Sequence, residues 1–292
     1  MSKIVCFGEV LWDVFPTHKK IGGAPLNVAL RLNSFVNEVT MISSVGNDDD
    51  GRAIINYIKD SGVNIDEIQI NENFKTSHVI VRLDDTRSAS YTIEFPCAWD
   101  HIELKKSSKD VVRNSDAFIF GSLVTRNKIS RNTLFELLEI AEFKIFDVNL
   151  RPPHYSIPVL KELMNIADFI KFNDSELLEI CANYNFRSKD LTENIKFIAR
   201  ETKTNQVCVT LGSKGATLFI NGKFYKSNGY YVTVKDTVGA GDSFLATIIH
   251  ELLNGTKPMD AINIACAVGA LVASKEGANP QISNNELKNI MI

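Results

Sequence analysis

The chain has 292 residues, of which 45% are hydrophobic, and its formal net charge is −3. This hydrophobic content is enough for a sizeable core, so a disordered or fibrous protein is excluded. The small negative charge, without a long basic run, gives no support for nucleic-acid binding, and no apolar run is long enough to span a membrane.

The cysteines give no sign of a disulfide framework or a zinc site. They are odd in number, scattered and mostly inside apolar stretches, and the sequence has no CxxC pair or Cys/His cluster. Met1-Ser2-Lys3 leads directly into a strand-like segment rather than a targeting signal. We therefore expect a cytoplasmic enzyme. The five cysteines are Cys6, Cys97, Cys181, Cys208 and Cys266.

Short apolar segments alternate with helical patterns along most of the chain. The predicted strands are 4–7, 39–43, 117–120, 144–147, 169–172 and 207–210. The predicted helices are 26–35, a segment marked by Ile54, Ile55 and Ile58, 134–140, 159–166 and a segment around Leu177 and Leu178. Pro25 suits the first turn of the helix that follows it. The alternation predicts an α/β fold, with a mainly parallel central sheet covered by helices on both faces.

The interval 76–95 departs from this rhythm because its apolar and polar residues alternate. It reads as a β-hairpin with strands 78–83 and 89–95 and a turn at Asp84-Asp85. Two interpretations are open. The hairpin extends the edge of the main sheet, or it forms a small β-lid over an active site, which can also pair with a second subunit in a homodimer.

A cluster near the N-terminus is suited to binding hydroxyl groups. Gly22 and Gly23 permit a ligand to approach the backbone closely, and Asn27 falls in the first turn of the following helix. The side chains of Asp13 and Asn27 offer acceptors and donors for vicinal hydroxyls. The alternative is that Asp13 is a solvated loop residue and Asn27 a capping residue.

Three further clusters follow predicted strands, at the strand ends where ligands collect in open α/β sheets. In Asp147-Val148-Asn149-Leu150-Arg151, the arginine can hold a phosphoryl group or a substrate oxygen. In 173–176, Asn173 and Glu176 can orient hydrated Mg²⁺, or they form a capping box. The turn at Thr210, Gly212 and Gly215 is either a plain hairpin turn or part of a nucleotide site.

The last cluster is Asp236-Thr237-Val238-Gly239-Ala240-Gly241-Asp242. The segment 230–234 before it is predicted to be a strand because aromatic and β-branched residues dominate it. The helix after it carries an apolar face and ends at Gly255. Free N–H groups at a helix N-terminus bind anions, and a carboxylate there would repel a phosphate.

Asp242 makes sense at that position if it takes a proton from a nucleophile that attacks phosphorus, which indicates phosphoryl transfer to a hydroxyl. The alternative is that the aspartate caps the helix and Gly239-Ala240-Gly241 is a tight turn. Since phosphoryl transfer needs a site shielded from water, it favours the lid interpretation of 76–95.

Taken together, these motifs resemble those of the ribokinase-like (PfkB) carbohydrate kinases, in the same order and over nearly the full length. The resemblance implies a single ribokinase-like domain over 1–292, with β-lid segments inserted around 9–17 and 75–100. Within the family the chain most resembles fructokinases, in the segments 8–13, 22–29 and 147–152. Ribose specificity is less expected, because Ala24-Pro25 stands where ribokinases usually carry a lysine. The matching motifs are Gly22-Gly23, Asn173 with Glu176, Thr210-Gly212-Gly215 and the loop 236–242.

The implied activity is transfer of the γ-phosphoryl group of ATP to a primary hydroxyl of a ketose, with D-fructose the expected acceptor. The alternatives are a 2-keto-3-deoxygluconate kinase, another sugar or nucleoside kinase of the family, and a sugar- or nucleotide-binding regulator without catalysis. A Rossmann dehydrogenase is disfavoured because the first strand lacks GxGxxG.

The resemblance also implies residue roles. Asp242 is the base, and the N–H groups of Gly239, Ala240, Gly241 and Asp242 form an anion hole. The residues implied to bind the sugar are Asp13, Gly22, Gly23, Asn27, Asn149, Arg151 and Asp242. Those implied to bind the nucleotide are Asn173, Thr210, Gly212, Gly215, Gly239, Gly241 and Asn279.

Glu176 and Asn173 are expected to act on Mg²⁺ through water. Asp236, with carbonyl groups near Val238, Val272 and Gly277, occupies the stretch where relatives bind a monovalent cation such as K⁺. One departure from the family pattern is the aromatic segment 95–101. Its Trp99 either packs over the sugar or fills the lid hinge, and His101 is expected to be structural.

Overall fold

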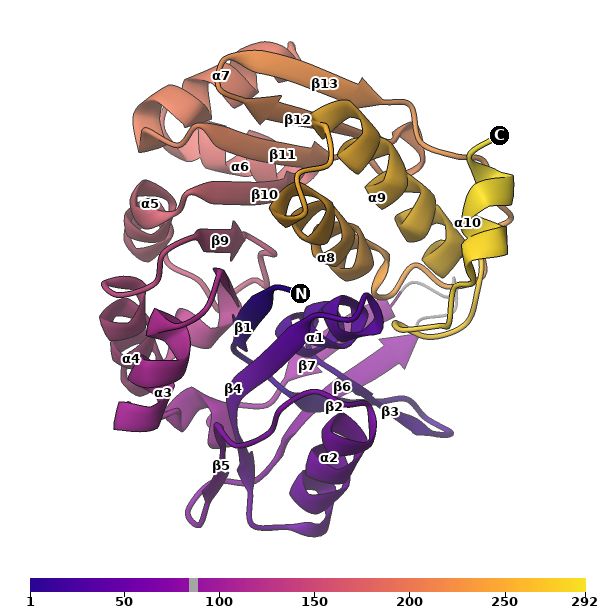
Figure 1. Ribbon diagram of the computed structural model, residues 1–292. Helices are drawn as coiled ribbons and strands as arrows, with labels where there is room; N and C mark the ends of the chain where they lie inside the picture. Colours follow the sequence, from indigo (N-terminus) through magenta and orange to yellow (C-terminus); the bar gives the residue numbers. More distant parts are fainter. Residues whose placement is uncertain (84–88) are drawn as a thin grey trace. The chain divides into compact units, whose positions relative to one another are not determined.

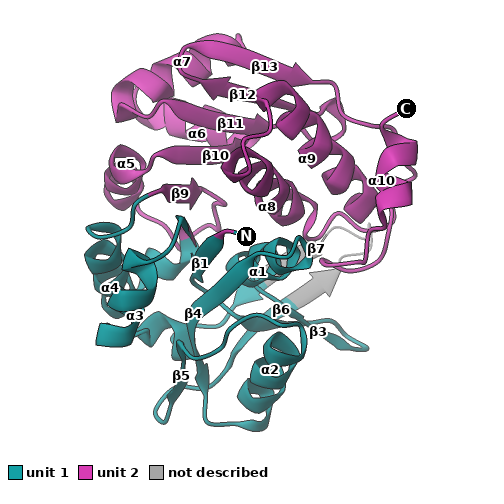
Figure 2. Ribbon diagram, in the orientation of Figure 1, with its two compact units in different colours: residues 1, 3–118, 123–142 teal, residues 2, 119–122, 143–292 magenta. Residues whose placement is uncertain are grey.

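The computed structural model describes residues 1–83 and 89–292, and they fold into two compact units (Figures 1 and 2). Unit 1 comprises residues 1, 3–118 and 123–142, and unit 2 comprises residues 2, 119–122 and 143–292. No helix in this described part of the chain is long and apolar enough to cross a membrane.

Unit 1 contains most of the N-terminal half of the chain. Its main elements are β1 (Lys3–Phe7), α1 (Ala24–Ser34), β4 (Glu38–Gly46), α2 (Asp49–Asp60), β5 (Ile68–Asn71), α3 (Lys106–Arg113) and α4 (Lys128–Leu138), with short 3₁₀ helices η1 (Ala98–His101) and η2 (Leu123–Arg126). Strand β1 pairs in parallel with β4, and β4 with β5. Helix α1 packs against β1 and β4.

A second, four-stranded sheet also belongs to unit 1, and we call it the lid sheet. It consists of β2 (Leu11–Val14), β3 (Lys19–Gly22), β6 (Ser77–Leu83) and β7 (Ala89–Ile93), in the order β3-β2-β6-β7. The pairs β2–β3 and β6–β7 are antiparallel, whereas β2–β6 is parallel. The predicted hairpin is therefore confirmed as part of a separate lid, and the edge-extension interpretation is wrong. Residues 84–88, which include the predicted turn, lie outside the described residues.

Unit 2 contains the parallel strands that carry the C-terminal clusters. Its elements are β9 (Lys144–Asp147), α5 (Ile157–Ile166), β10 (Phe169–Asn173), α6 (Asp174–Asn183), α7 (Leu191–Thr202), β11 (Gln206–Thr210), η3 (Gly212–Lys214), β12 (Ala216–Ile220), β13 (Lys223–Ser227), α8 (Ala240–Leu253), α9 (Pro258–Ala273) and α10 (Asn284–Ile290). Strands β9, β10 and β11 run in parallel, and β12 and β13 are antiparallel. Helices α8 and α9 lie side by side (Figure 1).

With β8 (Ala117–Gly121), whose residues are shared by both units, the described strands give a nine-stranded sheet in the order β13-β12-β11-β10-β9-β8-β1-β4-β5. The buried strands are almost continuously apolar, as expected for parallel strands covered on both faces. All five cysteines are free and buried.

The predicted strand over 230–234 is wrong. In the described chain these residues form no regular element, and Tyr231 is 98% and Val234 59% exposed. Strand propensity reflects how aromatic and β-branched side chains fit a half-buried pleated surface, and here that surface is missing. The segment instead leads to Lys235 and Asp236, whose N–H groups both donate to the carbonyl of Ala273.

Candidate active site

The hydroxyl-binding residues predicted near the N-terminus come together in unit 1. Asp13 lies on β2, and a Cβ atom on Gly22 would collide with its Oδ2, so only glycine lets the carboxylate occupy this place. Gly23 has a φ of 114° and caps α1, and a Cβ there would collide with the carbonyl of Glu9. The N–H of Asn27 donates to Gly23 O at 2.9 Å. The cluster therefore holds a half-buried carboxylate and a buried amide close to a glycine pair.

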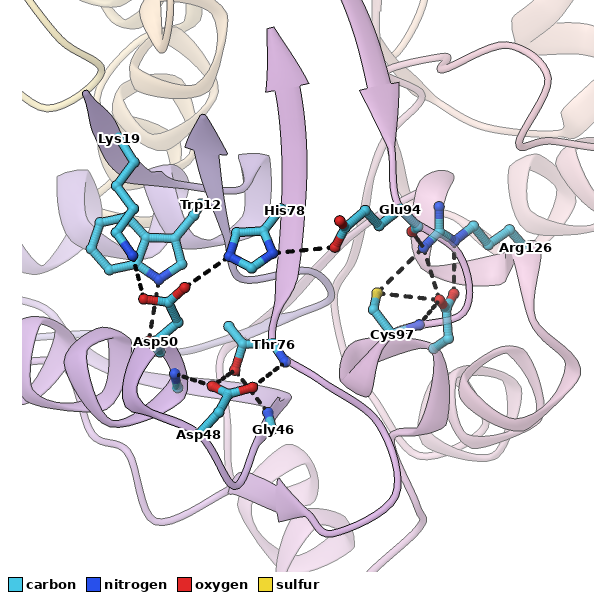
Figure 3. A network of polar contacts seen from close by, with 12 residues as sticks. Trp12, Lys19, Gly46, Asp48, Asp50, Thr76, His78, Glu94, Cys97 and Arg126 are labelled. Carbon is cyan, nitrogen blue, oxygen red and sulfur yellow. Dashed lines mark hydrogen bonds and ion pairs between the residues drawn. The ribbon is translucent and has the colours of Figure 1, made fainter. Parts of the chain in front are cut away.

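The lid sheet is fixed to the start of α2 by a polar network (Figure 3). Asp50 forms an ion pair with Lys19 of β3 and contacts His78 Nε2 of β6 at 2.8 Å. Its carbonyl accepts a hydrogen bond of 3.2 Å from Trp12 Nε1 of β2. The nearby ammonium and imidazole groups hold the pKa of Asp50 below its ordinary value, although partial burial acts in the opposite direction. Three lid strands are thus tied to one aspartate.

Asp48 connects the same helix to the chain entering β6. It caps α2 by accepting from Gly51 N at 2.7 Å, and it also accepts from Thr76 N at 2.9 Å and Thr76 Oγ1 at 2.6 Å. These hydrogen bonds outweigh the effect of burial and hold the pKa of Asp48 below its ordinary value. Figure 3 shows Asp50 with Trp12, Lys19 and His78, and Asp48 with Thr76.

The aromatic segment after the lid hairpin is structural. Trp99 is fully buried, and the guanidinium of Arg126 lies 4.0 Å from its ring centre. Arg126 also forms hydrogen bonds of 2.7 and 2.8 Å with the buried carboxylate of Asp100. His101 stacks on Phe74 with ring centres 3.6 Å apart. Trp99 therefore packs inside unit 1 beside Arg126 and presents no exposed face to a sugar.

In unit 2 three neighbouring parallel strands end in polar residues, Asp147 on β9, Asn173 on β10 and Thr210 on β11. Asn173 and Thr210 are register partners, and Thr210 Oγ1 donates to Phe172 O at 3.3 Å. The turn after β11 needs glycine, since a Cβ on Gly215, with a φ of 84°, would collide with Ser227 O. The predicted strand-end clusters of β10 and β11 are thus adjacent.

Asn173 and Glu176 form the capping box that the sequence left as an alternative to metal binding. Asn173 Oδ1 accepts from Glu176 N at 2.8 Å, and Glu176 Oε2 accepts from Asn173 N at 2.8 Å. Glu176 Oε1 accepts from Leu150 N at 3.0 Å. Burial raises the pKa of Glu176, while Lys171 and these amides act in the opposite direction.

Lys171 is a functional candidate that the sequence reasoning missed. It lies in the middle of β10, directly opposite Asp147 of β9, and its Nζ is 3.0 and 3.3 Å from the two carboxylate oxygens. Burial lowers the pKa of its ammonium, but the carboxylates of Asp147, Glu176 and Asp242 outweigh this effect and raise it. The sequence did contain a signal for this residue, because Lys171 is a single lysine within an otherwise apolar predicted strand.

The loop after β9 carries Asn149 and Arg151, which differ in their surroundings. Asn149 has a φ of 37°, and its carbonyl accepts from Ser122 Oγ at 3.3 Å. Arg151 is exposed, and its Nη1 donates to the carbonyl of Leu150 at 3.0 Å. An exposed guanidinium on a short loop can reach an anionic ligand.

The N-terminus of α8 carries the residues on which the predicted chemistry depends. Gly239 is the N-cap, with a φ of 76°, and Asp242 is the third residue of the helix. The alternative that Asp242 is the N-cap residue is therefore wrong, because Gly239 occupies that position. The N–H of Ala240 donates to Thr237 O at 3.3 Å, so this member of the predicted anion hole has a backbone acceptor.

The carboxylate of Asp236 joins the loop before α8 to the segment after α9. Its Oδ1 accepts from Val238 N at 3.0 Å and its Oδ2 from Gly277 N at 3.1 Å. A Cβ on Gly239 would collide with Ala278, so the two segments are in close contact. The half-buried Asn279 follows directly. The structure thus places Asp236 and Val238 close to Gly277, next to the segment that carries Asn279.

Among the described residues, no group of three or more His, Cys, Asp or Glu side chains is arranged to hold a metal ion. Both oxygens of Glu176 already accept hydrogen bonds from amides, and each retains a second lone pair. This arrangement fits Mg²⁺ that arrives with nucleotide phosphates and keeps most of its waters, and it does not fit a resident metal centre.

The mainly parallel nine-stranded sheet and the separate lid sheet define a ribokinase-like α/β fold. The family model for "pfkB family carbohydrate kinase" matches residues 1–285, and the chain belongs to this family. It is 27% identical over 310 residues to "Probable fructokinase-3" of Arabidopsis thaliana, covering 96% of this chain and 88% of that protein.

Solved structures give the same fold with different acceptors. Fructokinase from Vibrio cholerae O395, with fructose, ADP and a calcium ion, is 25% identical, with a TM-score of 0.84 and coverage of 100% of this chain and 99% of that one. A double mutant of that enzyme, with fructose, ADP and a potassium ion, is 24% identical, with a TM-score of 0.85 and the same coverage. Aminoimidazole riboside kinase from Salmonella enterica is 22% identical, with a TM-score of 0.83 and coverage of 99% of both chains. The fold therefore does not select the acceptor.

Proposed function

We propose that this carbohydrate kinase is a fructokinase, which transfers the γ-phosphoryl group of ATP to a primary hydroxyl of D-fructose. Ala24-Pro25 beside the Gly22-Gly23 pair and the Asn149-x-Arg151 segment support this acceptor. The names of the curated relatives agree with it. The proposal assigns the sugar to the cluster in unit 1 and the phosphoryl donor to the clusters in unit 2.

The observation that carries the proposal is the place of Asp242 in α8. A carboxylate in the first helical turn interacts favourably with the helix dipole, yet a bound phosphate would be repelled by it. Gly239 occupies the N-cap position and Asp242 lies three residues further on, so Asp242 is not the N-cap residue. A base that removes the proton of an attacking hydroxyl needs this position, close to helix N–H groups that stabilise charge on the transferred group.

The remaining residues take supporting roles in the proposal. Asp13 and Asn27 accept and donate hydrogen bonds to sugar hydroxyls, and Gly22 and Gly23 let the sugar approach the backbone. Arg151 contacts the transferred phosphoryl group, assisted by the loop at Asn149. The nucleotide-binding residues are Asn173, Thr210, Gly212, Gly215, Gly239, Gly241 and Asn279.

Two cations complete the proposal. Mg²⁺ bound to ATP supplies charge neutralisation on the phosphates, and Glu176 with Asn173 orients its waters. K⁺ is proposed near Asp236, where this carboxylate and the backbone around Gly277 meet. Replacement of KCl by NaCl at constant ionic strength tests the second cation.

The test of the function is a panel of acceptors with MgATP, followed by coupled detection of ADP. The panel contains D-fructose, 2-keto-3-deoxygluconate, D-ribose, adenosine and aminoimidazole riboside. We expect the highest kcat/KM with D-fructose and, by NMR of the product, a phosphate on a primary carbon. A clearly higher kcat/KM for another acceptor would refute the fructose assignment, and no turnover with any of them would contradict catalysis itself.

A further inference from the structure

A buried cation lies against the first turn of α8. Lys171 is 6% exposed, and its neighbours on β10, Ile170 and Phe172, are fully buried. A Cβ on Gly241, the second residue of α8, would lie only 3.5 Å from Lys171 Nζ. The ammonium therefore points from the sheet toward the proposed phosphoryl-transfer site, entirely within unit 2.

This is an unfavourable place for a positive charge. The N-terminus of a helix carries a partial positive charge, so a cation beside it is repelled. Burial adds a desolvation cost, and an ion pair such as Lys171–Asp147 often contributes no more to stability than well-packed apolar side chains. Pairing with Asp147 alone therefore gives no reason to keep a lysine at this position.

The charges around Lys171 explain why a buried cation is useful at this position. Lys171 interacts electrostatically with the carboxylates of Asp147, Glu176 and Asp242. One ammonium among three carboxylates leaves a net negative charge, and a bound nucleotide would add more. The buried ammonium of Lys171 and the N–H groups of α8 are positive partners for that charge, in addition to the exposed guanidinium of Arg151.

We propose that Lys171 is a positioning residue for phosphoryl transfer: its ammonium, fixed by Asp147, holds the Asp242 carboxylate in place and offsets the repulsion between this carboxylate and the nucleotide phosphates. The inference rests on the proposed function, and in particular on Asp242 as the base. It assigns to Lys171 an effect on turnover that is separate from its effect on folding.

Lys171→Met and the double variant Lys171→Met/Asp147→Leu separate the two effects. The single variant leaves a buried carboxylate unpaired, and it should lose stability. The double variant removes both charges and should recover most of the melting temperature. We expect kcat at saturating MgATP and sugar to be lowered by about 10- to 100-fold in both variants, with the KM for the sugar within about threefold of wild type.

If Lys171 has only a structural role, the opposite result is expected. The double variant, once its stability is recovered, would then also recover its turnover. A folded double variant with kcat within about threefold of wild type overturns the proposal. If neither Met variant folds, Lys171→Gln keeps a hydrogen-bond donor for Asp147 without the charge, and Lys171→Arg keeps both. Turnover that is low in the Gln variant and higher in the Arg variant supports the proposal, and equal turnover in the two contradicts it.

Wild type and Asp242→Asn are measured beside these variants. If Asp242→Asn turns over normally, the proposed base is wrong, whatever Lys171 does. If Asp242→Asn is inactive while the Lys171/Asp147 double variant is active, the base stands and the inference about Lys171 alone fails.

Discussion

Glu176 accepts a hydrogen bond of 3.0 Å from the backbone N–H of Leu150, a residue 26 positions earlier in the chain. Its other carboxylate oxygen accepts from Asn173 N at 2.8 Å. One buried side chain thus fixes both the loop after β9, which carries Arg151, and the start of α6. Any metal-directing role of Glu176 is superimposed on this structural one.

The buried carboxyl group of Glu176 makes a pH-dependent contribution to stability. Because burial raises its pKa above the ordinary value of 4.5, this contribution is fully present below about pH 4.5 and is lost as the pH rises through the higher pKa of the folded state. Glu176→Gln cannot titrate. We therefore expect the unfolding free energy of wild type to fall relative to that of Glu176→Gln between pH 4 and pH 8, as measured by urea unfolding.

Glu142→Gln is the control for this series, since Glu142 is exposed. It shows what loss of an exposed side-chain charge does to stability at each pH. A difference between Glu176→Gln and wild type that does not change with pH would contradict the inference that burial dominates at Glu176.

Removal of the proposed base should abolish most of the turnover. Positioned general bases contribute about 10²- to 10⁴-fold, so Asp242→Asn should lower kcat by that factor. The fold should survive with the loss of about 0.3–1 kcal/mol of helix-dipole interaction, and affinity for ATP should hold or rise because a negative charge is removed. Single-turnover phosphorylation at saturating MgATP and fructose is the decisive measurement.

Glu251→Gln, near the C-terminal end of the same helix, is the matched control and should turn over like wild type. Turnover of Asp242→Asn within a few-fold of wild type would show that this carboxylate has only a structural role at the start of α8.

Asp13→Ala should weaken binding of the sugar and leave binding of the nucleotide unchanged. A lost charge-assisted hydrogen bond is worth about 1.5–3 kcal/mol, so the KM for the sugar should rise by about one to two decades. Binding of ATP, measured by calorimetry without sugar, should not change. An equal loss of ATP affinity in a folded variant would show that the hydroxyl-binding cluster is assigned wrongly.

Gly239 and Gly255 form a matched pair for testing the N-terminus of α8. Their φ angles are 76° and 78°, but a Cβ on Gly239 would collide with Ala278, whereas nothing lies within 4 Å of a Cβ on Gly255. We expect Gly255→Ala to cost about 1–2 kcal/mol of unfolding free energy, with normal kcat. Gly239→Ala should cost more and also lower kcat, because the clash displaces the N–H groups of the proposed anion hole.

Urea unfolding and steady-state kinetics of the two alanine variants check this pair. Equal losses of stability, with normal kcat in both, would show that the close approach of Gly239 to Ala278 is not needed for the reaction.

The parallel strands could be predicted because each carries an apolar run, whereas their order in the sheet was not predicted. The segment 230–234 has the same composition as a strand, yet pairing depends on a neighbouring strand and on burial, which its own residues do not encode. The partners of the lid hairpin illustrate the same limit. Main-chain pairing of β6 with β2 has no distinctive side-chain pattern in the sequence.

For the candidate site, the positions of glycines and short polar side chains at strand ends and helix starts could be predicted from their spacing. Lys171 was not, since its partner Asp147 lies 24 residues away and only the parallel register of β9 and β10 places them opposite each other. The capping role of Gly239 was also missed, because the sequence shows an aspartate in the first turn without showing where the helix begins.

The burial of all five cysteines has a practical consequence for experiments on the lid. Burial raises the pKa of Cys97 to about 12 and that of Cys181 to about 11, so these thiols remain protonated and poorly nucleophilic at neutral pH. A cysteine introduced at an exposed site would therefore be the preferred target of a maleimide dye. A fluorophore placed in this way can report motion of the lid sheet without a cysteine-free background.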